Sequence, residues 1–177
     1  MQNIQSLIQP FLPDEITTCT LKGKGAVNNA FLVETRTGSK YIVKQEREDK
    51  EFQPQNSLSV EANVIKKLSS SGLSCPVSRV VFISEDPKMY GYEYIDGEML
   101  RSLWTSLTEE VKVHICKSLG EFHAEIGKKI SKADAEVLGV VIDPSTDVHP
   151  EVSRDYNAIN ENPDVPEESK SIAKNAK

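Results

Sequence analysis

The apolar residues of this chain change their spacing at Asp96-Gly97. Before this dipeptide they occur mainly in short apolar or β-branched runs, which are typical of strands. After it they recur every three or four residues, which is the spacing of a helix. This order predicts an α+β fold in which a sheet is built first and helices follow it.

Two hairpins are expected in the first part of the chain. Their strands are the runs Ala30 to Thr35, Tyr41 to Lys44, Arg79 to Ser84 and Met89 to Ile95. Thr37-Gly38-Ser39 joins the first pair, and Glu85-Asp86-Pro87-Lys88 joins the second, and both segments are rich in turn-forming residues. A short amphipathic helix is predicted ahead of them, with Ile4, Leu7, Ile8 and Phe11 on one side.

Two further helices are predicted. The first separates the hairpins, with Ser57 or Ser59 as its cap and an apolar side made of Val60, Val64, Ile65 and Leu68. The charged segment Gln45 to Asn56 before it contains a proline and predicts a solvated loop. The second helix carries Val111, Ile115, Leu119, Phe122 and Ile126, and Ser106 with Glu109 fits a capping box at its start.

Composition excludes several classes of function. The net charge is −6, so the chain has no overall positive field for nucleic acid. No apolar run approaches the roughly 20 residues that cross a membrane, and the start has no signal-peptide pattern, so a cytoplasmic protein is expected. Its three cysteines are scattered without a C-x-x-C pair, which favours inert thiols over a disulfide or metal site.

Two glycines, Gly23 and Gly25, precede the first hairpin's main strand, and Asn28 follows them. A turn without Cβ atoms lets backbone N–H groups approach a phosphate closely. The same pattern also suits an ordinary turn. The glycines become informative only together with residues elsewhere in the chain.

Lys44 and Glu61 supply that support. Lys44 ends an apolar strand, and Glu61 lies on the apolar side of the next helix. A carboxylate on that side needs a cation, and Lys44 is the nearest one upstream on a core strand. Such a pair would place an ammonium group in front of the glycine turn, where kinases hold ATP phosphates. The alternative is an exposed Glu61 at the edge of the apolar side.

These features, with the segment Glu93 to Glu98, together resemble the N-terminal lobe of the aminoglycoside phosphotransferase and choline kinase superfamily. The resemblance spans about Leu21 to Ile126. It implies a protein-kinase-like N-lobe, an antiparallel sheet of about five strands with one packed helix, followed by the first helices of a mainly α C-lobe. It also implies ATP as the cofactor, with main-chain groups of Glu93 and Ile95 contacting adenine. His123 resembles a histidine of the family's first long C-lobe helix, and a hydrogen-bonded core role is expected for it.

The resemblance divides the chain into three parts. Residues 1–95 would form the ATP-binding N-lobe, residues 96–143 the hinge and first C-lobe helices, and residues 144–177 a polar segment expected to be flexible. The family's catalytic loop, H-x-D-x-x-x-x-N, has no good counterpart. Asp155 and Asn160 have its spacing, but Ser153 replaces the histidine. Mg²⁺ is therefore expected only in a full-length enzyme, and no metal ligand is assigned.

The expected activity is ATP-dependent transfer of the γ-phosphate to a hydroxyl of a small molecule, with this chain inactive by itself. Three explanations for the missing loop stay open: a piece of a longer protein, an interrupted gene, or a noncatalytic nucleotide-binding or regulatory module of the pseudokinase kind. The expected partners are a nucleotide and an unidentified small acceptor, not nucleic acid or membrane. Self-association is expected as well, because a lone lobe exposes apolar surface.

Overall fold

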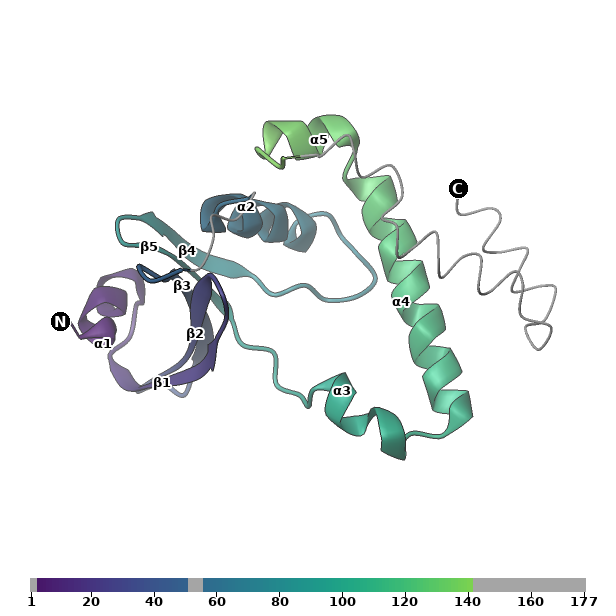
Figure 1. Ribbon diagram of the computed structural model, residues 1–177, viewed down its shortest axis with the longest axis horizontal. Coiled ribbons are helices and arrows are strands. Elements are labelled where there is room, and N and C mark those ends of the chain that lie inside the picture. The colour runs from purple at the N-terminus through teal and green to yellow at the C-terminus, as the bar shows by residue number, and fades with distance from the viewer. Residues whose placement is uncertain (1–2, 51–55, 142–177) are drawn as a thin grey trace. The chain divides into compact units, whose positions relative to one another are not determined.

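A computed structural model describes residues 3–50 and 56–141 of the chain. Its elements are α1 (Ile4–Ile8), η1 (Gln9–Phe11), β1 (Ile16–Lys24), β2 (Asn28–Thr35), β3 (Lys40–Glu46), α2 (Leu58–Ser69), β4 (Val80–Glu85), β5 (Lys88–Glu93), α3 (Leu100–Leu103), η2 (Trp104–Ser106), α4 (Glu109–Lys129) and α5 (Lys132–Val137). Five strands form one antiparallel sheet in the order β1-β2-β3-β5-β4. The predicted α+β class and the five-strand sheet with a packed helix are confirmed (Figure 1).

Side-chain alternation gives the sheet two apolar faces. On one face α1 and η1 pack against Val33, Val43 and Met89, which are fully buried. On the other face α2 packs against Tyr90, which is also fully buried. The residue Lys44 follows Val43 along β3 and so belongs to the α2 face.

Helix α2 has two apolar sides, whereas the sequence indicates one. Leu58 and Ala62 are buried against the sheet. The residues predicted to form its apolar side line a groove with α4 and α5, and only Ile65 among them also packs against the cluster on the sheet; the groove residues from α2 are Val60, Glu61, Val64, Ile65 and Leu68. Glu61 therefore lies at the border between the side that packs on the sheet and the side that lines the groove.

Several predicted boundaries are wrong by one or two residues. Strand β3 continues through Glu46, and β5 ends at Glu93 instead of Ile95. Of the two serines predicted as caps of α2, Ser57 is confirmed, since it accepts a hydrogen bond from the Val60 amide at 3.3 Å. The cap of α4 is Thr108, since its Oγ1 accepts from the Val111 amide, whereas the Ser106 hydroxyl donates to the Leu103 carbonyl one turn earlier.

The segment after β5 leads into the helices that follow the sheet (Figure 1). Helix α4 has no buried residue, and several of its apolar residues are exposed, for example Val111 and Leu119. Ser74 donates hydrogen bonds from its amide and hydroxyl to Glu125, which ties α4 to the loop that follows α2. In the part of the chain that the structure describes, no helix has the length and apolarity needed to cross a membrane.

Candidate functional site

Lys44 and Glu61 form the predicted ion pair. The ammonium of Lys44 donates to Glu61 Oε1 at 2.5 Å, from β3 to the first turn of α2. Their side chains keep 29% and 39% of their exposure, so Glu61 is neither fully buried nor fully exposed. A pair this accessible stabilises the fold by about 1 kcal/mol or less, because water screens it. Its main consequence is orientation of the ammonium group.

The glycine turn lies next to this ammonium. Residues 25–27 join β1 and β2, and the Gly25 amide donates to the Asn28 carbonyl at 2.8 Å. A Cβ on Gly25 would stand 3.2 Å from that carbonyl oxygen, which is a tight contact and accounts for glycine there. Gly23 lies where the register between β1 and β2 shifts.

A cavity of about 450 Å³ joins the turn to the lysine. It is lined by Gly23, Lys24, Gly25, Ala26, Val27, Asn28, Ala30 and Lys44. The structure thus brings together four residues that the sequence singled out from separate segments, namely Gly23, Gly25, Asn28 and Lys44. An ammonium beside main-chain N–H groups at a turn is suited to an anion such as a phosphate.

Arg47 fixes the position of this turn through contacts that the sequence does not predict. Its guanidinium donates to the Gly25 carbonyl at 2.5 Å, and its main-chain amide donates to the Val27 carbonyl at 2.9 Å. Its side chain is only 9% exposed and also pairs with Asp49 at 2.9 Å. The prediction of a solvated loop is therefore wrong at Arg47, because this arginine pairs with main-chain groups of the glycine turn.

Hydrogen bonds from Arg47, together with the charges of Arg47 and Lys24, hold the pKa of Asp49 well below its usual range. Asp49 thus stays ionised at neutral pH and links two cations beside the turn, Arg47 at 2.9 Å and Lys24 at 3.4 Å. Both ends of the turn are connected through this carboxylate. The arrangement restricts the conformations open to the glycine segment.

Several apolar residues on the same sheet face as Lys44 were not identified from the sequence. Strand register places Ala30 opposite Lys44 on one side and Tyr90 opposite it on the other. Leu32 and Ile42 are the next pair along the same face, and both are half-buried. A count of every second residue from Lys44 would have found them. They form the apolar surface that continues from Lys44 toward the end of β5.

Glu93 and Ile95, the two residues assigned to base binding, differ in how open their main-chain groups are. The Glu93 amide already donates to the Arg79 carbonyl at 3.0 Å, and the Tyr94 amide to the Lys40 carbonyl at 3.0 Å. The Glu93 amide is therefore not open to a base, and only its carbonyl remains a candidate. Ile95 lies beyond the strand and is 59% exposed. A role for Glu93 and Ile95 in base binding stays a prediction.

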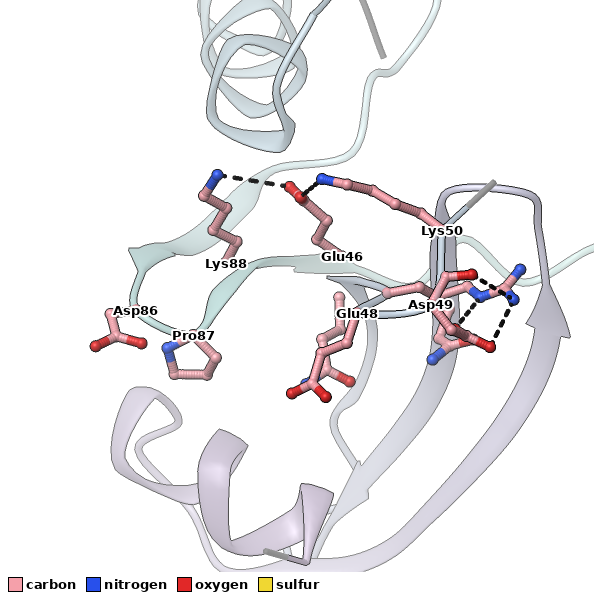
Figure 2. A pocket seen from close by; sticks show the side chains of 10 residues that line it. Glu46, Glu48, Asp49, Lys50, Asp86, Pro87 and Lys88 are labelled. Carbon is pink, nitrogen blue, oxygen red and sulfur yellow. Dashed lines mark hydrogen bonds and ion pairs between the residues drawn. The ribbon is translucent and has the colours of Figure 1, made fainter. Parts of the chain in front are cut away.

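A second cavity, of about 730 Å³, lies at the far end of β3 beside the turn between β4 and β5. Figure 2 shows Glu46 between Lys50 and Lys88, with Asp86 and Pro87 on the turn. Glu46 pairs with Lys50 and lies 4.0 Å from Lys88. Four carboxylates line this cavity against three cations, whereas the cavity at Lys44 is lined by two lysines and no acidic residue, so this cavity is less suited to an anion.

The other residues singled out from the sequence, Asp155, Asn160 and His123, do not belong to the site around Lys44. Asp155 and Asn160 lie outside the described residues. His123 is exposed and makes an edge contact with the Phe122 ring, so the expected core position is wrong: helix α4 is not buried along this side. Within residues 3–50 and 56–141, no cluster of three or more His, Cys, Asp or Glu side chains could hold a metal ion.

Comparison with solved structures identifies the fold. The gentamicin complex of APH(2")-IIa aligns over 98% of this chain and 55% of its own, with 17% identity and a TM-score of 0.64. The streptomycin–ATP ternary complex of the same enzyme, APH(2")-IIa, aligns over 90% of this chain and 52% of its own chain, with 17% identity and a TM-score of 0.62. The GDP complex of wild-type aminoglycoside 2'-phosphotransferase-IIIa covers 92% and 52%, with 17% identity and a TM-score of 0.58.

These likenesses show that the chain has the aminoglycoside phosphotransferase fold, which is kinase-like. No protein-family model and no curated protein sequence matches the chain. The chain spans about half the length of the solved structures that it matches.

Proposed function

We propose that this chain is the nucleotide-binding half of an ATP-dependent phosphotransferase that acts on a hydroxyl group of a small molecule. The observation that carries the proposal is the Lys44–Glu61 pair beside the glycine turn, in one cavity with Gly23, Gly25 and Asn28. The solved structures of this fold include complexes with ATP, GDP and aminoglycosides, which supports a nucleotide and a small acceptor.

In this proposal each residue has a defined task. Lys44 contacts phosphate oxygens, and Glu61 holds its ammonium in place. Main-chain N–H groups of Ala26 and Val27 contact the same phosphates, whereas the Gly25 amide donates to the Asn28 carbonyl and shapes the turn. The Glu93 carbonyl accepts a hydrogen bond from the base, and the Ile95 amide donates one. The residues that would transfer the phosphoryl group are not among these, and no step through a metal ion is derived.

The test is nucleotide affinity measured by calorimetric titration of the wild-type chain and of Lys44→Ala with adenine and guanine nucleotides. A hydrogen bond to a charged group contributes about 1.5–3 kcal/mol, so the variant should bind roughly ten- to a hundredfold more weakly. Lys66→Ala is the matched control, since Lys66 is an exposed lysine on α2 whose loss changes the charge equally. Equal affinity of wild type and Lys44→Ala would contradict the proposal.

A further inference from the structure

The hydroxyl of Tyr90 is buried without a hydrogen-bond partner. Tyr90 is 0% exposed, and its Oη is one of the buried side-chain atoms without a partner in the part of the chain that the structure describes. Buried polar groups are nearly always paired, and unpaired ones in folded proteins often have a functional reason. This hydroxyl lies close to the residues assigned to the phosphates.

Tyr90 is the cross-strand partner of Lys44. The two residues are directly opposite in the antiparallel pairing of β3 and β5, and their side chains share the face that α2 covers. The Lys44 ammonium lies 6.0 Å from the centroid of the Tyr90 ring. The same ring packs against Leu58 and Ala62 of α2, which flank Glu61 in the sequence. Tyr90 therefore contacts both elements of the Lys44–Glu61 pair.

Tyr90 keeps its proton at any ordinary pH. Burial raises the pKa of its hydroxyl, the negative charge of Glu61 raises it further, and so does the closeness of the hydroxyl to that carboxylate, although the two form no hydrogen bond of regular geometry. The hydroxyl is therefore a donor, and the charge close enough to act on it is the Glu61 carboxylate. Lys44 contacts Oε1 of that carboxylate, and a carboxylate has further acceptor capacity at its second oxygen.

We propose that Tyr90 is a positioning residue of the phosphate site, whose hydroxyl donates to the Glu61 carboxylate when Lys44 contacts a nucleotide. The inference rests on the proposed function. When the Lys44 ammonium shares its N–H groups with phosphate oxygens, its bond to Glu61 weakens. A neutral donor from β5 then keeps the carboxylate, and with it the lysine, in place. In the nucleotide-free protein the Tyr90 hydroxyl has no hydrogen-bond partner, and in the nucleotide-bound protein it donates to Glu61.

This role predicts opposite effects of Tyr90→Phe on stability and on binding. Removing an unpaired buried hydroxyl should leave the melting temperature of the nucleotide-free protein unchanged or raise it. Losing a donor to a charged group should weaken nucleotide binding about tenfold. Tyr41→Phe is the matched control, because Tyr41 is a largely buried tyrosine on the opposite face of the same sheet. It should change neither quantity.

A double-mutant cycle with Glu61→Gln identifies the acceptor. If the hydroxyl acts through the Glu61 carboxylate, Tyr90→Phe should cost less affinity in the Glu61→Gln background than in the wild type. An equal loss in both backgrounds would overturn the inference. So would a Tyr90→Phe variant that melts at a lower temperature and loses affinity only in proportion, since that pattern belongs to a packing role.

The two proposals can fail separately. If Lys44→Ala loses affinity and Tyr90→Phe does not, the phosphate site stands and the role of Tyr90 is refuted. If the wild-type chain binds neither adenine nor guanine nucleotides, the proposed function fails and the role of Tyr90 fails with it.

Discussion

The guanidinium of Arg47 donates a hydrogen bond of 2.5 Å to the carbonyl of Gly25, so the end of β3 is tied to the turn between β1 and β2. Lys44 lies three residues before Arg47 in the same stretch of chain. The glycine turn and the proposed phosphate-binding lysine are thus held by neighbouring residues of one segment. A turn that is fixed in this way has less conformational freedom to lose when it binds a ligand.

Arg47→Ala should therefore affect the turn without removing any proposed ligand contact. We expect the free energy of unfolding to fall by about 1–3 kcal/mol, because carbonyls of the turn lose a charged donor. Nucleotide affinity should fall several-fold under conditions where the variant is folded. Urea unfolding and calorimetric titration measure the two quantities.

Arg36→Ala is the control for this variant. Arg36 also pairs with an acid, Glu15, but both side chains are well exposed, at 72% and 60%. An exposed substitution of this kind changes stability by about 0.5 kcal/mol or less. If Arg47→Ala and Arg36→Ala behave alike in both measurements, the turn does not depend on Arg47.

The Lys44–Glu61 pair could be predicted because both residues stand on strongly patterned elements, an apolar strand and an amphipathic helix. Arg47 could not, because it lies in a run of charges and its partner Gly25 is 22 residues earlier. A contact of that kind depends on how β1, β2 and β3 pair. Tyr90 was missed for the same reason. Its place opposite Lys44 depends on the non-sequential pairing of β3 with β5.

The two sides of α2 show a second limit of sequence patterns. Val60, Val64 and Leu68 form the more obvious apolar side, yet they line the groove with α4 and α5. The side against the sheet uses Leu58 and the small Ala62, because β5 brings the large Tyr90 there. The size of a residue that fits at an interface depends on the residue opposite it. The sequence of α2 alone does not show that Tyr90 lies opposite Ala62.

Acid should weaken the N-terminal cap of α5 and its contact with α2, because Asp134 takes part in both. Hydrogen bonds from the Ser131 hydroxyl and amide, and the contact with Lys67, lower the pKa of Asp134 from 3.8 to about 2. The unfolded chain therefore binds more protons than the folded one between these values, so stability rises with pH across that window. This contribution is fully present above about pH 4 and is lost as pH falls toward 2.

Asp134→Asn removes the titrating group. The difference in urea midpoint between wild type and variant should be constant near neutral pH and should shrink as pH is lowered from about 4 toward 2. Asp14→Asn is a suitable comparison, since Asp14 accepts a hydrogen bond from Thr37 on another part of the surface. A midpoint difference for Asp134→Asn that does not depend on pH would contradict the assignment.

Helix α4 should make this chain self-associate. Its apolar residues Val111, Val113 and Leu119 are 42%, 66% and 48% exposed, and α4 has no buried residue. Exposed apolar surface of this kind favours contact with a second apolar surface in water. We propose a second copy of the chain as the partner, and expect the molar mass from light scattering to exceed 19.7 kDa and to rise with concentration.

Leu119→Lys should lower this mass toward that of a monomer, because it places a charge in the contact. Ser118→Lys adds the same charge at a polar neighbour on α4 and should leave association unchanged. A wild-type chain that is monomeric at every concentration would contradict the prediction, and so would an equal effect of the two lysine variants.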